Sequence, residues 1–268
     1  MEKIDRIKGA LYGFAIGDAM GATTEFMNQG QIRATYGCLD DIIGGGWLDL
    51  KPGEVTDDTQ MSLCVMSALM EGDYQNFKTR VANNFAKWLA SDPEDVGNQC
   101  YKAIRYYAEE GKYIGNNNSA LGNGSLMRAL PCSLLNDSLS VELNVMQGSV
   151  THDNETCADI IKEYSSFIKS AIRGEEIIFP ERKLLEPTGY VVNTFNNVLI
   201  WAGKDNFEAT IIGAVNHGGD ADTIAAIAGG LAGARFGYDS IPKKWIDKLN
   251  SDVKHELDLF LNFVIKTY

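Results

Sequence analysis

The chain has 268 residues, 45% of them hydrophobic and 22% charged, which suits a globular protein with one large core. Its formal net charge of −12 opposes long-range attraction to nucleic acid and to anionic membranes, so we expect neither as a partner. The five cysteines lie far apart and form no CxxC pair. They indicate reduced thiols rather than a zinc or thioredoxin-like site.

The length fits one domain or two tightly fused halves, and we expect a single domain over residues 1–268 that acts as a monomer. Charges of both signs in residues 1–6 argue against a signal peptide. No uncharged run approaches the roughly 20 residues that a membrane span requires. We therefore expect a cytoplasmic protein without a membrane anchor.

The first twenty residues are expected to form a buried helix, because their apolar residues recur at helical spacing. Each glycine inside a helix costs roughly 1 kcal/mol relative to alanine. Glycines nevertheless recur here at every fourth position, which predicts a stripe where another backbone approaches closely. The stripe consists of Gly9, Gly13, Gly17 and Gly21.

The rest of the chain also reads as mainly helical. Residues 223–234 are apolar on every side, which is typical of a helix at the centre of a protein, and residues 59–69 predict a third buried helix. No strand–helix–strand repeat is present, so the predicted fold class is all-α, with residues 190–193 as the expected exception. Amphipathic helices are predicted over 76–90, 97–110, 154–172 and 242–265, and loops around Pro93 and over 111–118 and 174–189.

Two acidic turns each open an apolar helix. Neighbouring side chains on a helix point about 100° apart, so Asp57 and Asp58 suit a helix entry from which they can fan out toward cations. Asp220 and Asp222 have the spacing that puts both carboxylates on one side of an extended segment. With their neighbouring threonines they offer only oxygen atoms, which favours magnesium or manganese. The alternative for either turn alone is simple helix capping.

Other polar residues stand in apolar or glycine-rich surroundings. Asp18 and Glu25 would be costly to bury unless paired or coordinated, although Asp18 could be a cap and Glu25 could be solvated. Residues 122–128 combine flexible backbone with free amides, an arrangement suited to cradling phosphate. His152 could contact a ligand or serve as a core or capping residue.

Together these motifs resemble the ADP-ribosylglycohydrolase family. The resemblance spans residues 9 to about 237, and the order and spacing of the motifs make coincidence improbable. The matching segments are Gly9-Ala10, Gly17-Asp18-Ala19-Met20-Gly21 with Glu25, Thr56-Asp57-Asp58-Thr59, Asp95-Val96-Gly97, Gly122-Asn123-Gly124-Ser125-Leu126-Met127-Arg128, Thr151-His152 and Asn216-His217-Gly218-Gly219-Asp220-Ala221-Asp222-Thr223. One departure is Asn98 and Gln99, where family members often carry threonines.

The resemblance implies an all-α orthogonal bundle with a central cleft that holds two Mg²⁺ or Mn²⁺ ions. The implied metal ligands are Thr56, Asp57, Asp58, Asp220, Asp222 and Thr223. The implied catalytic residues are Glu25, Asp58 and Asp222. The residues implied to bind substrate are Asp95, Gly122, Asn123, Gly124, Ser125, His152, Gly218 and Gly219.

The implied activity is metal-dependent hydrolysis of the N- or O-glycosidic bond between ADP-ribose and a modified acceptor. The expected partner is an ADP-ribosylated protein or small molecule, with ADP-ribosyl-arginine on protein as the first substrate to consider. ADP-ribosyl-serine, O-acetyl-ADP-ribose and poly(ADP-ribose) stay open as alternatives. So does a non-catalytic ADP-ribose-binding protein, although every implied ligand is present. An unrelated metal-dependent phosphohydrolase would need further ligands.

Overall fold

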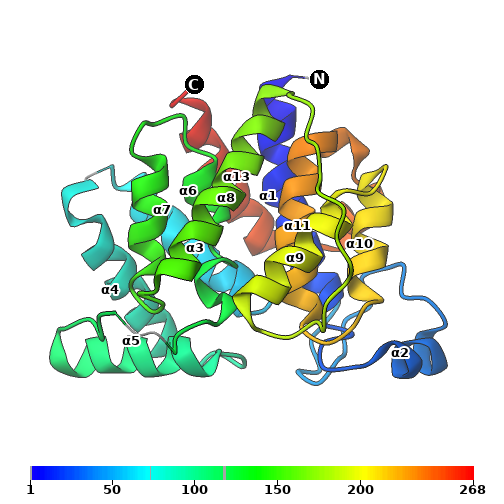
Figure 1. The fold of residues 1–268 in the computed structure, drawn as a ribbon, viewed down its shortest axis with the longest axis horizontal. Helices are drawn as coiled ribbons and strands as arrows, with labels where there is room; N and C mark the ends of the chain where they lie inside the picture. The colour runs from blue at the N-terminus through cyan, green and yellow to red at the C-terminus, as the bar shows by residue number, and fades with distance from the viewer. Residues whose placement is uncertain (1, 73, 117–118) are drawn as a thin grey trace.

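The computed structural model describes residues 2–72, 74–116 and 119–268, and within them the chain consists of helices joined by loops (Figure 1). The only β-pairings in these ranges are two isolated bridges, Gly45 with Leu50 and Gly122 with Tyr190. The predicted all-α class is therefore confirmed. The helices are α1 Lys3–Gly21, α2 Gln29–Tyr36, α3 Asp57–Met70, α4 Phe77–Leu89, α5 Asn98–Glu110, α6 Leu130–Ser133, α7 Ser140–Gly148, α8 Glu155–Arg173, α9 Val191–Ala202, α10 Phe207–Val215, α11 Ala221–Phe236, α12 Lys243–Lys248 and α13 Ser251–Ile265, with 3-10 turns at Tyr74–Asn76, Asn123–Ser125 and Tyr238–Ser240.

Helices α1 and α11 form the centre of the molecule, and both are buried along most of their length (Figure 1). The glycine stripe of α1 lies directly against the α11 backbone, as the sequence predicts. A Cβ atom added at Gly17 would lie 2.1 Å from the carbonyl oxygen of Ala225, and one at Gly13 would lie 2.4 Å from that of Gly229. Since no side chain fits there, glycine allows two segments from opposite ends of the chain to pack backbone to backbone.

Gly17→Ala is expected to lower the free energy of unfolding by about 1–3 kcal/mol, because the added methyl group forces the two central helices apart. The change should destabilise although alanine is the better helix former. Denaturant unfolding checks this, with Gly30→Ala on the exposed α2 as the matched control, where the nearest atom is a side-chain oxygen at 3.2 Å. Equal effects of the two substitutions would contradict the close approach.

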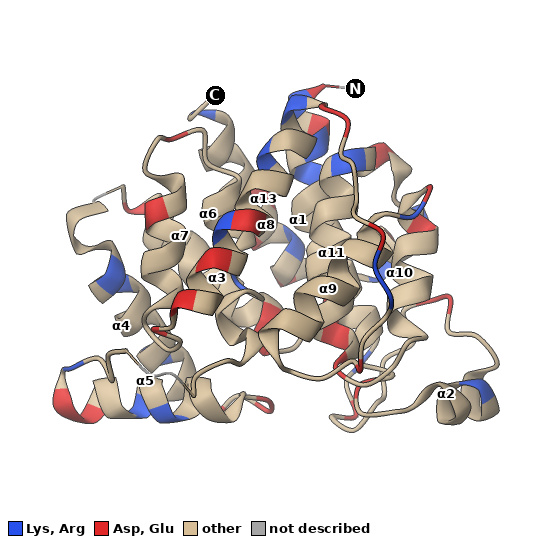
Figure 2. Ribbon diagram, in the orientation of Figure 1, with Lys and Arg blue, Asp and Glu red and all other residues tan. Residues whose placement is uncertain are grey.

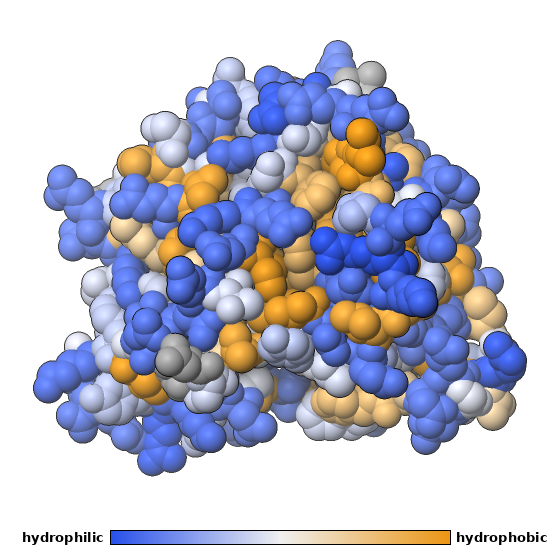
Figure 3. Space-filling model, viewed as in Figure 1, coloured by the Kyte–Doolittle hydropathy of each residue, from blue (hydrophilic) through white to orange (hydrophobic). Residues whose placement is uncertain are grey.

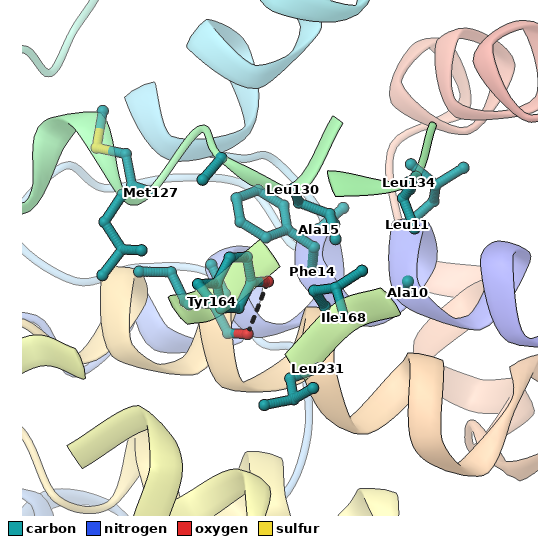
Figure 4. Close-up of a cluster of buried hydrophobic side chains, with 14 of the residues drawn as sticks. Ala10, Leu11, Phe14, Ala15, Met127, Leu130, Leu134, Tyr164, Ile168 and Leu231 are labelled. Carbon is teal, nitrogen blue, oxygen red and sulfur yellow. Dashed lines mark hydrogen bonds between the residues drawn. The ribbon is translucent and has the colours of Figure 1, made fainter. Parts of the chain in front are cut away.

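The apolar core surrounds this central pair. In Figure 4, side chains of four helices meet: Leu11 and Phe14 of α1, Leu130 of α6, Ile168 of α8 and Leu231 of α11. The buried Tyr164 hydroxyl donates a hydrogen bond to the Ile227 carbonyl oxygen at 3.3 Å, which satisfies its polar group inside the core. These contacts fix α1, α6, α8 and α11 relative to one another.

Two predicted elements are wrong in detail. Residues 191–193 are not a strand but the first turn of α9, where Val191 is buried in the core, and only Tyr190 takes part in a β-bridge. The helix predicted over 242–265 is two helices, because the Asn250 side chain accepts hydrogen bonds from Asp252 N and Val253 N and starts α13 anew. The predicted loops are present, except that residues 117–118 lie outside the described residues.

The face of the molecule in Figure 3 carries mostly hydrophilic residues, with smaller hydrophobic areas near its middle, and its lower edge is indented. Among the described residues, no helix is both long enough and apolar enough to cross a membrane.

Candidate active site

The acidic turn at the start of α3 is held in place by a buried carboxylate of α1. Asp18 is fully buried and accepts hydrogen bonds from Thr56 N at 3.1 Å, Thr56 Oγ1 at 2.9 Å and Thr59 N at 3.0 Å. Burial raises the pKa of Asp18, and these hydrogen bonds oppose that rise. Asp18, a residue of α1, therefore caps the N-terminus of α3. In this way it fixes the positions of Asp57 and Asp58, the first two residues of α3.

The two acidic turns contact each other. Thr223 Oγ1 donates to Asp58 Oδ2 at 3.1 Å, and Thr56 Oγ1 lies 3.5 Å from Asp222 Oδ2. Figure 2 shows the acidic segments near the lower ends of the central helices. Each turn lies at a helix N-terminus, where the helix dipole favours negative charge. Carboxylates from distant parts of the sequence are thus gathered at one point.

Glu25 and Asp95 complete this acidic cluster. One carboxylate oxygen each from Glu25, Asp95 and Asp222 lie within 4.8 Å of one another, close enough to bind one cation. Glu25 follows the end of α1 and accepts a hydrogen bond from Trp47 Nε1 at 2.6 Å. Asp57 accepts a hydrogen bond from Gly97 N at 3.2 Å, which ties α3 to the loop that carries Asp95.

The charges of the cluster are strongly unfavourable without a cation. Burial, then repulsion from neighbouring carboxylates, raises the pKa of Asp57 to about 8. The pKa of Glu25 is also raised to about 8 by burial, although its hydrogen bond from Trp47 opposes the rise. Burial raises the pKa of Asp220 to about 6, and burial with mutual repulsion raises the pKa values of Asp58 and Asp222 well above the ordinary value. Burial first, and neighbouring negative charges second, thus penalise the ionised forms.

The donor set fits a hard divalent cation. Asp58 Oδ1 and Asp222 Oδ1 are buried and have no hydrogen-bond partner among the described residues. Buried carboxylate oxygens without partners are costly, and a bound cation would satisfy them. The cluster offers oxygen atoms from carboxylates and threonine hydroxyls, the ligands that Mg²⁺ and Mn²⁺ prefer.

A cleft of about 720 Å³ opens over the acidic cluster. Of the predicted site residues, those lining it are Glu25, Asp57, Asp95, Gly122, Asn123, Gly124, His152, Gly219, Asp220, Asp222 and Thr223. Thr56, Asp58, Ser125 and Gly218 do not line it. Thr56 and Asp58 contact the cleft residues from beneath, and Gly218 packs on the Met27 carbonyl oxygen, which a Cβ atom would meet at 2.1 Å.

Part of the cleft wall consists of residues that the sequence motifs do not indicate. Trp47 and Phe26 lie beside Glu25, and residues 187–189 form another wall. The Pro187 carbonyl oxygen accepts a hydrogen bond from Asp220 N at 2.8 Å, which joins the end of a long loop to the second acidic turn. The run of three glycines before Trp47 was a usable signal of a special turn, because all three have positive φ.

A buried arginine fixes the orientation of His152 beside the glycine-rich loop. The Arg128 guanidinium, fully buried, donates to the Gly124 carbonyl oxygen and to Thr151 Oγ1, the latter at 2.6 Å. Because Thr151 accepts this bond, its own proton is available for His152 Nδ1 at 2.7 Å. Burial, then repulsion from Arg128, lowers the pKa of His152 to about 3. We infer a neutral imidazole whose proton is on Nε2, next to Gly122.

Comparison with known proteins identifies the class to which this fold and site belong. The family model described as ADP-ribosylglycohydrolase matches residues 1–186 and 176–265. The chain therefore belongs to the ADP-ribosylglycohydrolase family, which is a family of hydrolases. The family is metal-dependent, and the acidic cluster agrees with that property.

Individual relatives extend over nearly the whole chain. The ADP-ribosyl-[dinitrogen reductase] glycohydrolase of Rhodospirillum rubrum is 37% identical, covering 94% of this chain and 93% of its own. The ADP-ribosylarginine hydrolase Tri1 of Pseudomonas putida is 32% identical over 92% of this chain and 75% of its own. A solved structure, titled as an ADP-ribosylglycohydrolase-related protein complex, superposes with a TM-score of 0.85 at 28% identity and covers 100% of this chain and 99% of its own.

Proposed function

We propose that this protein hydrolyses the bond between ADP-ribose and an arginine side chain of a modified protein, using two Mg²⁺ or Mn²⁺ ions. The observation that carries the proposal is the meeting of two acidic turns under one cleft, with partnerless carboxylate oxygens on Asp58 and Asp222. The arginine acceptor is supported by the similarity to the ADP-ribosylarginine hydrolase of Pseudomonas putida. We also propose that residues 1–268 form one domain, since α1 and α11, far apart in the sequence, pack backbone to backbone. We propose that this domain acts as a monomer.

The proposed ligands of the ions are the oxygen donors of the two turns. Divalent cations in such a site supply Lewis acidity and offset the negative charge of the carboxylates. Asp58 and Asp222 have the additional role of holding the cluster together through Thr223 and Thr56. The full set is Thr56, Asp57, Asp58, Asp220, Asp222 and Thr223, with Glu25 and Asp95 close enough to contribute.

The proposed reaction breaks the bond between the anomeric carbon of the ribose and a guanidine nitrogen. The oxygen of a water molecule joins the anomeric carbon, and one proton of that water ends on the leaving nitrogen, through an oxocarbenium-like transition state. Glu25 lines the cleft and is the residue that we propose to move this proton, as base toward water or as acid toward the nitrogen.

The ADP part of the substrate is proposed to bind along the glycine-rich loop. Gly122, Asn123, Gly124 and His152 would contact it through backbone amides and the Nε2 proton, with Asp95 and Gly219 nearer the ribose. Ser125 and Gly218 lie behind the cleft wall and would support these contacts. A volume of about 720 Å³ lies within the range of small-molecule sites.

Thr151→Val is expected to weaken ADP-ribose binding roughly five- to tenfold, because His152 loses the hydroxyl that keeps its proton on Nε2. The nitrogen NMR shifts of the His152 imidazole report which nitrogen carries the proton, and an ADP-ribose titration measures the affinity. Thr151→Ser keeps the hydroxyl and should restore both readings. If the valine variant kept the wild-type shifts and affinity, the hydrogen-bond chain from Arg128 would have no such role.

The proposed acceptor is tested by comparing substrates at equal concentration: arginine-linked, serine-linked and poly(ADP-ribose) substrates and O-acetyl-ADP-ribose, each with magnesium or manganese. Release of ADP-ribose should be fastest from the arginine-linked protein. Faster release from another acceptor would replace the arginine assignment. ADP-ribose binding without release from any substrate would instead indicate a non-catalytic binding protein.

A further inference from the structure

Two large aromatic side chains stand exposed at the mouth of the cleft. Phe26 is 68% exposed and Trp47 is 52% exposed, although both belong to residue types that stabilise a protein by burial. Their ring centroids lie 5.5 Å apart, and both side chains line the cleft beside Glu25. We call Phe26 and Trp47 the aromatic pair.

The backbone at Phe26 is strained. Its φ of 60° lies in the left-handed region, which costs a bulky L-residue roughly 1–2 kcal/mol. A hydrogen bond from Phe26 N to the Gly219 carbonyl oxygen at 2.7 Å holds this conformation against the second acidic turn. A strained backbone that presents an exposed ring adds little stability, and such strain is concentrated at functional sites.

Trp47 is held by an equally special turn. Gly44, Gly45 and Gly46 all have positive φ, and a Cβ atom at Gly46 would lie 2.2 Å from the Ala22 carbonyl oxygen. The turn brings the indole N–H to 2.6 Å from Glu25 Oε2. The indole N–H of Trp47 therefore orients Glu25, and the indole ring lies next to Phe26.

The surroundings of the aromatic pair select a cation. The cleft beside the pair is lined by carboxylates, among them Glu25, Asp95 and Asp222. A planar guanidinium can stack on aromatic faces and donate hydrogen bonds to carboxylates at the same time. A serine hydroxyl or an acetyl ester carries no positive charge, and neither is a planar group edged by N–H donors.

Building on the proposed function, we propose that the aromatic pair is the acceptor subsite, which binds the guanidinium of the modified arginine and so selects arginine-linked ADP-ribose. In this role Phe26 and the ring of Trp47 stack on the acceptor, and Glu25 lies at its edge. Trp47 is in addition a positioning residue for Glu25 through its N–H.

Three substitutions separate these contributions. Phe26→Leu removes the aromatic face and keeps an apolar side chain, whereas Phe26→Tyr keeps the face. Trp47→Phe keeps a ring but removes the hydrogen bond to Glu25. Since both side chains are already largely exposed, the variants should fold, which thermal unfolding verifies. Tyr106→Leu, an exposed aromatic on α5 outside the cleft wall, is the matched control.

For Phe26→Leu we expect KM for the arginine-linked substrate to rise about five- to thirtyfold, the size of a cation–π contact, with the inhibition constant of free ADP-ribose within about twofold of wild type. Phe26→Tyr should restore KM. Trp47→Phe should lower kcat with little change in KM, since the face remains and Glu25 loses its partner. Tyr106→Leu should leave both constants unchanged.

Unchanged KM in Phe26→Leu would overturn the inference, and so would an equal loss of affinity for free ADP-ribose, which would assign the pair to the ADP-ribose part. Wild-type protein that releases no ADP-ribose from arginine would instead overturn the proposed function. In that event calorimetric titration still tests the pair, because arginine-linked ADP-ribose should bind more tightly than free ADP-ribose only when Phe26 is present.

Discussion

Asp222→Asn is expected to abolish ADP-ribose release while making the metal-free protein more stable. The carboxylate lies in the buried acidic cluster, where repulsion from Glu25 and Asp58 raises its pKa beyond the effect of burial. An amide removes that charge and offers the cation one neutral oxygen in place of a carboxylate. A loss of several kcal/mol of transition-state stabilisation corresponds to roughly a thousandfold in rate.

Steady-state kinetics and thermal unfolding in EDTA measure the two effects on the same sample. Asp247→Asn, on the surface of α12, is the control for loss of one negative charge. It should leave both activity and stability near wild type. If Asp222→Asn is less stable than wild type without metal, groups of the protein itself already stabilise the Asp222 carboxylate, and it needs no cation.

The metal-free protein is expected to lose stability as the pH rises from 6.5 to 8.5. The folded-state pKa values of Asp57 and Glu25 are raised to about 8 from ordinary values of 3.8 and 4.5. Over this window the folded protein binds more protons than the unfolded chain, so the free energy of unfolding falls with increasing pH. For each proton that the folded state binds in excess, the free energy of unfolding falls by up to about 1.4 kcal/mol per pH unit.

Urea unfolding at several pH values, with EDTA and with magnesium, measures this slope. The window begins at pH 6.5 because His152, with its pKa lowered to about 3, acts in the opposite direction at lower pH. Magnesium should flatten the slope, since a bound cation favours the ionised carboxylates. A stability that rises with pH in EDTA would show that the carboxylates are not in the unfavourable environment described here.

The sequence predicts well those features that depend on local pattern. The glycine stripe at every fourth residue of α1 predicts a close helix approach, because only a neighbouring backbone explains four glycines in register. Two acidic turns, each opening an unusually apolar helix, likewise favour cation binding over simple helix capping. In the structure the glycine stripe packs on the α11 backbone, and the two turns contact each other through Thr223 and Thr56. The metal ligands themselves stay a prediction.

Features that depend on contacts between distant segments were beyond prediction. Nothing in the sequence near Trp47 reveals that its indole reaches Glu25, because that contact depends on the turn at Gly46 packing against the end of α1. Asp18 could equally have been a cap or the partner of an arginine. The break at Asn250 was also missed, since apolar spacing continues through it and only the side-chain cap ends the pattern.

We propose that the cleft hydrolyses ADP-ribosyl-arginine with divalent cations bound by the acidic cluster. The most direct test is release of ADP-ribose from an arginine-modified protein after exhaustive chelation, and again after adding back magnesium or manganese. We expect no release in the chelated sample and full recovery with the metal. Undiminished release from protein shown to be metal-free would mean that the acidic cluster needs no cation for the reaction.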